Sequence, residues 1–182
     1  MTILHIDSSI NGEGSASRAV SRSIVGQLTG PAGEAVIYRD LAANPLPDLT
    51  LEAFADSSDL DEFLAADTIV IGAPMYNFTL PTQLKAWIDR IMVAGRTFRY
   101  GPNGPEGLAG GKRVIVALAR GGQYDVGSPA AGLEHLESYL RAVFNFMGIE
   151  PEFVAADGLA IGPEQREQSL SRALGHTLRL AA

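Results

Sequence analysis

The chain has 182 residues, 46% of them hydrophobic, which predicts a single domain over residues 1–182 with a continuous core. Its net charge of −7 repels polyanions and its basic residues are scattered, so neither nucleic acid nor a membrane surface is expected as a partner. The absence of cysteine excludes disulfides and thiolate chemistry. A strand follows Met1 almost directly, so no export signal is predicted and a cytoplasmic location is expected.

Strands and helices alternate along the whole sequence. In chain order the expected elements are strand 2–7, helix 16–28, strand 35–38, helix 51–66 with a break near 56–58, strand 68–72, helix 81–92, strand 113–119, helix 133–147, strand 152–156 and helix 164–180. The continuous apolar strands indicate a parallel sheet with helices on both faces, a three-layer α/β arrangement. Five strands favour the doubly wound, flavodoxin-like order 2-1-3-4-5, with a ligand site at the carboxyl ends of the strands.

A loop rich in small and hydroxyl residues follows the first strand and leads into a helix. We expect the hydroxyl groups of Ser9, Ser15 and Ser17, together with the backbone N–H groups of Ala16 and Ser17, to bind a phosphate. A helix end contributes only about 0.3–2 kcal/mol, so several such donors must act together. The alternative is an ordinary helix cap with a polar loop.

The loop after the third strand, residues 74–78, begins with Pro74 and places large side chains where a loop is usually polar. Met75, Tyr76 and Phe78 offer polarizable and aromatic surface to a flat ring, and Asn77 offers an amide to its edge. The alternative is a hydrophobic turn. Phosphate donors beside an amphipathic slot indicate a flavin site.

The fourth strand ends in Arg120-Gly121-Gly122, whose backbone N–H groups can come close to a ligand because glycine has no Cβ. In the expected topology this loop lies beside the two loops above. Gly12-x-Gly14 lacks the third glycine of the dinucleotide fingerprint, although Asp40 keeps a Rossmann alternative open as a ribose-binding acid. Gly110-Gly111-Lys112 precedes a strand, so no P-loop is predicted.

The three histidines have no metal-ligand spacing, and no metal site is expected. We expect His5 to lie within the first strand as a buried core residue. His135 and His176 are expected on helices, facing solvent. No Gly-x-Ser-x-Gly elbow is present, which disfavours a serine hydrolase. The lack of an acid, base and nucleophile in one constellation is typical of enzymes in which a cofactor carries the chemistry.

The chain resembles FMN-dependent NADH-azoreductases over nearly its whole length. The matching motifs are Ser9, Ser15-x-Ser17, Pro74-Met75-Tyr76-Asn77-Phe78, Pro81-x-x-Leu84-Lys85-x-Trp87-Ile88-Asp89, Thr97-Phe98-Arg99-Tyr100, Gly104-Pro105-Glu106-Gly107, Arg120-Gly121-Gly122, Gly148-Ile149 and Gly162-Pro163-Glu164. The resemblance implies a homodimer with one FMN per subunit, near the subunit boundary. The implied activity reduces quinones to hydroquinones and cleaves aromatic azo bonds, with NADH or NADPH as the donor.

The resemblance also implies roles for individual residues. The phosphate side of FMN would be held by Ser9, Ser15, Ala16 and Ser17. The ring would be held by Pro74, Met75, Tyr76, Asn77, Phe78, Ala119, Arg120, Gly121 and Gly122. The substrate pocket would be lined by Phe78, Tyr100 and Phe146.

Two departures from the family pattern affect the site. The family commonly has a hydroxyl residue where Ala119 stands, so only backbone contacts are expected there. The loop from Gln123 to Pro129 also differs, so substrate specificity does not transfer. A non-enzymatic FMN electron carrier is the main alternative, and an FMN-binding module without turnover is a second.

Overall fold

The computed structural model describes residues 1–30 and 33–180. Within these ranges, the elements are β1 (Thr2–Asp7), α1 (Ala16–Leu28), β2 (Ala35–Asp40), α2 (Ser58–Ala65), β3 (Thr68–Pro74), α3 (Thr82–Ile91), β4 (Phe98–Gly101), β5 (Gly104–Gly107), β6 (Arg113–Ala119), α4 (Glu137–Phe146), β7 (Glu152–Ala156) and α5 (Pro163–Thr177). None of the helices in the described ranges is long and apolar enough to cross a membrane.

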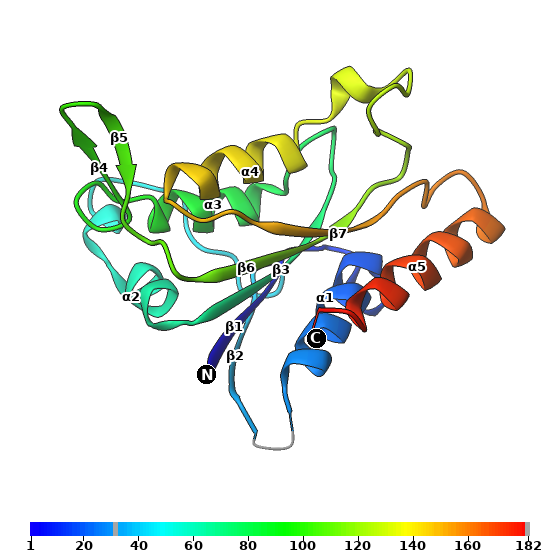
Figure 1. Cartoon of the computed structure of the whole chain (residues 1–182), viewed down its shortest axis with the longest axis horizontal. Coiled ribbons are helices and arrows are strands. Elements are labelled where there is room, and N and C mark those ends of the chain that lie inside the picture. The colour runs from blue at the N-terminus through cyan, green and yellow to red at the C-terminus, as the bar shows by residue number, and fades with distance from the viewer. Residues whose placement is uncertain (31–32, 181–182) are drawn as a thin grey trace.

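The central sheet has five parallel strands in the order β2-β1-β3-β6-β7 (Figure 1). With the separate hairpin β4–β5 left out of the count, this is the expected order 2-1-3-4-5. The flavodoxin-like fold is therefore confirmed. Strands β1 and β3 are neighbours although β2 lies between them in sequence. Successive strands are added on one side of β1 first and on its other side afterwards, so the topological switch point lies between the carboxyl ends of β1 and β3.

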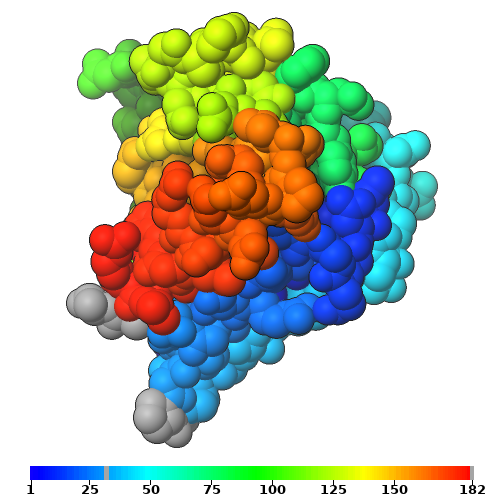
Figure 2. Space-filling view, turned by 90° about the vertical axis from the view of Figure 1, so that its right-hand side faces the viewer, coloured from blue at the N-terminus to red at the C-terminus, as the bar shows by residue number. Residues whose placement is uncertain are grey.

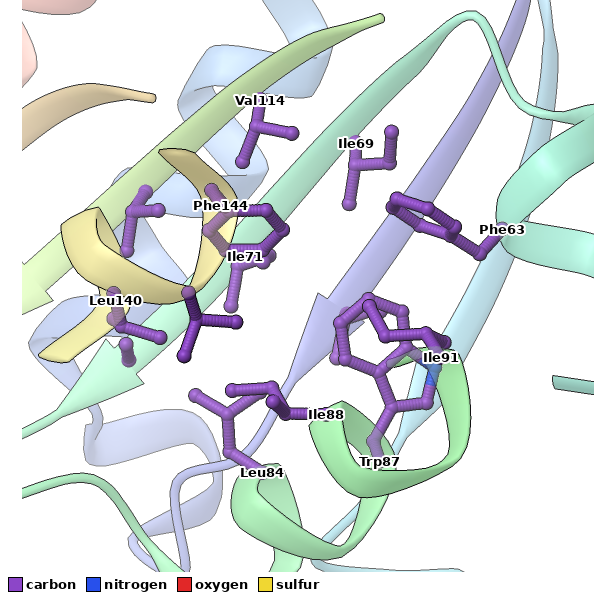
Figure 3. Packing of buried hydrophobic residues seen from close by; sticks show 14 of the residues in the cluster. Phe63, Ile69, Ile71, Leu84, Trp87, Ile88, Ile91, Val114, Leu140 and Phe144 are labelled. Atoms are coloured by element: carbon purple, nitrogen blue, oxygen red, sulfur yellow. The ribbon is translucent and has the colours of Figure 1, made fainter. Parts of the chain in front are cut away.

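Helices cover both faces of the sheet. Helices α1 and α5 lie together on one face, and α3 and α4 lie on the other (Figure 1). Helix α2 packs beside α3, and Phe63 from α2 meets Trp87 from α3 with ring centroids 6.0 Å apart (Figure 3). Full burial of each such side chain stabilises the fold by roughly 1.5–3 kcal/mol. This core holds the strands rigidly beneath the loops at their ends.

The structure differs from the sequence expectations at several element ends. The hairpin β4–β5 was not predicted, and a short 3-10 turn over 131–133 delays the start of α4 to Glu137. His135 consequently lies before α4, not on it, although it is exposed as expected. The expected break near 56–58 in the stretch 51–66 is confirmed, since a separate 3-10 turn forms at Ala53–Ala55 and α2 begins at Ser58.

Candidate functional site

The loops that follow β1, β3, β6 and β7 meet at the carboxyl end of the sheet, where Figure 2 shows the blue, green, yellow-green and orange segments together. They enclose a crevice of about 200 Å³. The crevice is lined by Ser9, Asn11, Gly14, Ser15, Ala16, Pro74, Met75, Tyr76, Ala119, Gly121, Leu159, Ala160 and Arg166.

One end of the crevice is built by the start of α1. Ser15 caps the helix, since its Oγ accepts from the N–H of Arg18 at 3.3 Å. Its hydroxyl also lies 3.0 Å from the hydroxyl of Ser17. Within the described ranges, the N–H groups of Ala16 and Ser17 donate to no acceptor in the protein. These free donors and the positive helix end form a seat for an anion.

Arg18 holds in place the loop between β1 and α1, residues 8–15, which we call the phosphate-side loop. Its guanidinium donates to the Ser9 carbonyl at 2.8 Å from Nη2 and at 3.3 Å from Nε. The same group forms a bidentate pair with Asp40, both contacts being 2.7 Å. Hydrogen bonding to Asp40 raises the pKa of Arg18, so the guanidinium stays charged. Asp40, which kept the Rossmann alternative open as a ribose-binding acid, is therefore already paired with Arg18.

A polar cluster extends this support beneath β1. Asp7 accepts from Ser21 at 2.8 Å and from Tyr38 at 3.1 Å, and the ring of His5 lies 3.0 Å from the Ser21 hydroxyl. Burial opposes ionisation of Asp7, but hydrogen bonding to His5 and Ser21 and the charge of nearby Arg18 outweigh it and lower its pKa. His5 is buried, as its position in a strand predicted.

The second loop makes a tight turn in a rare conformation. Tyr76 and Thr79 exchange backbone hydrogen bonds of 2.9 and 3.1 Å, and the two residues between them, Asn77 and Phe78, have φ of 48° and 72°. Asparagine tolerates positive φ, whereas phenylalanine does so at a cost. The Tyr76 hydroxyl accepts from the N–H of Ile10 at 3.1 Å, which joins this turn to the first loop.

The third loop is joined to the loop after β7 along its backbone. The N–H of Arg120 donates to Ala156, and the carbonyls of Arg120 and Gly121 accept from Leu159 and Ala160 at 3.1 and 3.0 Å. The carbonyl of Gly122 continues this pairing. Gly121 packs closely enough that a Cβ there would lie 3.3 Å from that of Ala160. The paired loops form one wall of the crevice.

The Arg120 side chain is buried behind that wall. It contacts Asp157 at 2.5 and 2.9 Å, and Glu134 and Glu137 at 3.5 Å. Burial disfavours its charge, but the hydrogen bonds and charge of Asp157 outweigh this effect and raise the pKa of Arg120. Arg120 therefore ties the loop after β6 to the loop after β7 and to the start of α4.

The structure brings together eight of the predicted cofactor residues in one crevice. They are Ser9, Ser15, Ala16, Pro74, Met75, Tyr76, Ala119 and Gly121. Five predicted residues do not line it within one chain: Ser17, Asn77, Phe78, Arg120 and Gly122. Ser17 is buried against Ser15, and Asn77 lines a neighbouring pocket with Ile10. Each of the five lies in a loop or helix start that also contributes to the crevice.

The predicted substrate-pocket residues Tyr100 and Phe146 lie elsewhere. They form an aromatic cluster with Phe98, with ring centroids of Tyr100 and Phe146 6.4 Å apart. This cluster sits where hairpin β4–β5 meets the end of α4, at the opposite end of the molecule from the carboxyl edge of the sheet (Figure 1). Tyr100 is 76% exposed. Within one chain, the cluster and the crevice are therefore separate.

Five crevice residues were missed by sequence reasoning: Asn11, Gly14, Leu159, Ala160 and Arg166. Leu159 and Ala160 follow the fifth strand of the sheet, so the rule that ligands bind beyond strand ends could have included them. Arg166 stands in the first turns of α5, which begins at this same edge. No local motif marked it.

The donor set fits a phosphorylated, flat, amphipathic ligand such as FMN. The free N–H groups of Ala16 and Ser17 suit the phosphate, while Met75, Tyr76 and Ala119 give apolar and aromatic walls. Both features are present in one open crevice.

The family model described as flavodoxin-like fold matches residues 1–180. The chain belongs to this flavodoxin-like family. A protein of Bradyrhizobium diazoefficiens named FMN-dependent NADH:quinone oxidoreductase 2 is 53% identical, and the match covers all of both chains. A protein of Methylobacterium radiotolerans named FMN-dependent NADH:quinone oxidoreductase is also 53% identical over all of both chains.

Solved structures place this flavodoxin-like chain beside azoreductases. An azoreductase from Bacillus anthracis str. Sterne superposes with a TM-score of 0.91 at 27% identity, covering 100% of this chain and 98% of the other. An FMN-dependent NADH-azoreductase from Bacillus anthracis str. Ames Ancestor, solved in complex with FMN, gives a TM-score of 0.84 at 26% identity, with 100% of both chains covered.

Proposed function

We propose that this protein is an FMN-dependent oxidoreductase. It uses NADH, or NADPH, to reduce quinones to hydroquinones and to cleave aromatic azo bonds to amines. The observation that carries the proposal is the crevice, in which free helix-end N–H groups stand beside Met75 and Tyr76 at the carboxyl edge of β1 and β3. Two relatives that are 53% identical over their full length, and that are named FMN-dependent NADH:quinone oxidoreductases, support the proposal.

The proposed roles follow from where each group lies. Ser9, Ser15, Ala16 and Ser17 bind the phosphate through hydroxyl and backbone donors. The walls formed by residues 74–78 and 119–122 orient the ring and exclude water from one side. When bound, FMN supplies the ring that accepts hydride from the nicotinamide and passes it to the acceptor. The chain supplies position and hydrogen bonds.

We further propose that the enzyme is a homodimer with one FMN per subunit. The cluster of exposed Tyr100 and half-buried Phe146 lies far from the crevice of its own chain, so it can join a substrate pocket only in a second copy. Phe78, which is 43% exposed beside the crevice, would face the same pocket. The acidic, cysteine-free sequence favours a cytoplasmic location.

Purified protein tests the proposal directly. We expect it to bind FMN, turn yellow and oxidise NADH when a quinone is added. Because one crevice serves the donor and the acceptor in turn, double-reciprocal plots at several quinone concentrations should be parallel. Intersecting plots would contradict the shared crevice. FMN binding without NADH oxidation would instead support the FMN-binding module without turnover. A stable one-electron-reduced flavin on titration would support the electron carrier, which the relatives' names do not favour.

A further inference from the structure

Arg166 is the only lysine or arginine that lines the crevice in the described part of the chain. It stands in the first turns of α5, which begins with Pro163, and reaches back to the phosphate-side loop. Its Nη2 donates to the carbonyl of Gly14 at 3.1 Å. Gly14 directly precedes Ser15, the cap of α1, so the guanidinium lies beside the free N–H groups of that helix start.

Arg166 also differs from most basic residues of this chain in its charge environment. Ten of the lysine and arginine side chains lie within 4.0 Å of a carboxylate, and Arg18 behind the loop is neutralised by Asp40. Within residues 1–30 and 33–180, no carboxylate lies this close to Arg166. A positive charge thus remains at the phosphate end of the crevice. Among the described residues, the only hydrogen-bond partner of the Arg166 side chain is Gly14, which leaves most of its five N–H donors unused there.

We propose that Arg166 binds the phosphate of FMN and gives the site its preference for the phosphorylated flavin. This inference rests on the proposed function and adds a cationic ligand to a seat otherwise made of hydroxyl and backbone groups. A phosphate monoester carries about −1.5 to −2 charges at neutral pH, and the whole chain carries −7, so a long-range repulsion opposes FMN. An arginine offers charge-assisted, bidentate hydrogen bonds that offset it.

The test compares Arg166→Gln with Arg172→Gln. Arg172 lies on the same helix, is exposed, and also has no carboxylate within 4.0 Å in the described ranges, so its replacement removes the same charge away from the crevice. Dissociation constants for FMN and for riboflavin, which lacks the phosphate, are measured with each apoprotein at low and high salt. Unfolding curves check that both variants stay folded.

We expect Arg166→Gln to weaken FMN binding about tenfold or more, as loss of a charge-assisted hydrogen bond predicts, and to leave riboflavin binding unchanged. The salt dependence of FMN binding should also become shallower. Arg172→Gln should bind both flavins like the parent protein. Arg166→Lys should keep the charge and recover part of the FMN affinity.

Three results would overturn the inference. One is equal FMN affinity in Arg166→Gln and the parent. Another is an equal loss of FMN and riboflavin affinity, which would indicate a structural role. The third is an equal loss of FMN affinity in Arg166→Gln and Arg172→Gln, which would indicate an effect of net charge alone. Failure of the parent protein to bind FMN would instead contradict the proposed function itself.

Discussion

Phe78 shows at the scale of one residue how the site depends on a costly conformation. Its φ of 72° places a bulky side chain in the left-handed region, in a two-residue turn whose second position is usually glycine. The conformation costs about 1–2 kcal/mol. The turn persists because neighbours hold it: the Phe78 carbonyl accepts from the N–H of His135 at 3.0 Å. The strained turn follows directly on Met75 and Tyr76, which line the crevice, and strain of this kind is often found beside functional sites.

Replacing Phe78 with glycine should therefore not destabilise the apoprotein and should raise its free energy of unfolding by up to about 1 kcal/mol, because relief of strain exceeds the entropy cost of glycine. Phe78→Ala is the matched control, since it removes the ring but keeps the strain. Urea unfolding of both variants measures the difference. Equal destabilisation by the two changes would show that the ring, not the backbone, governs stability here.

The crevice residues in the loops after β1 and β3 were predictable because each of these loops has a local composition that indicates ligand binding. Ser9, Ser15 and residues 74–76 were recognisable from local chemistry, and the topology rule then placed them together. The contacts of Arg18 and Arg166 could not be found in this way. Their partners are Asp40, 22 residues away, and Gly14, 152 residues away, and only the folded sheet brings them together.

At the scale of elements, hairpin β4–β5 shows why some structure escaped prediction. Its strands have four residues each and include glycines at Gly101, Gly104 and Gly107, which weaken every strand signal. The hairpin forms because it packs on the end of α4, so closely that a Cβ on Gly107 would overlap the backbone nitrogen of Gly148. Tertiary contact, not local propensity, fixes this element.

Gly107→Ala should thus push the hairpin away from α4 and cost about 1–3 kcal/mol of stability, as overpacking usually does. Gly26→Ala is the control, because Gly26 lies within α1 and a methyl group there would meet nothing within 4 Å apart from its chain neighbours and the backbone of its own helix. Alanine at that position should stabilise the helix by about 0.5–1 kcal/mol. Thermal unfolding should show a lower Tm for Gly107→Ala and a higher Tm for Gly26→Ala than for the parent protein. A neutral Gly107→Ala would mean that the hairpin moves freely.

For the whole molecule, the parallel sheet and its order were predictable because apolar strands and amphipathic helices alternate throughout the sequence. The sheet aligns the carboxyl ends of β1, β3, β6 and β7, and acidic groups then tie the loops at those ends to the scaffold. Asp40 binds Arg18 beneath the first loop. Glu134 accepts from the N–H groups of Leu136, Glu137 and Ser138 at the start of α4.

These carboxylates predict how stability depends on pH. Hydrogen bonding to Arg18 lowers the pKa of Asp40 below its ordinary 3.8. Burial opposes ionisation of Glu134, but the three backbone donors outweigh it and lower the pKa of Glu134 below 4.5. A carboxylate with a lowered pKa stabilises the fold above its ordinary pKa, and this contribution is lost as pH falls through the folded value. Asp59, whose pKa burial raises, contributes with the opposite sign.

The free energy of unfolding should therefore decline as the pH falls below about 4.5, through the ordinary values of Glu134 and then Asp40. Asp40→Asn removes one titrating group, so its urea-unfolding profile should start from a lower stability at about pH 7 and decline less steeply below about pH 4. Asp48→Asn serves as the control, since Asp48 forms no ion pair within the described ranges. An Asp40→Asn profile parallel to that of the parent would show that the Arg18 pair does not couple protonation to folding.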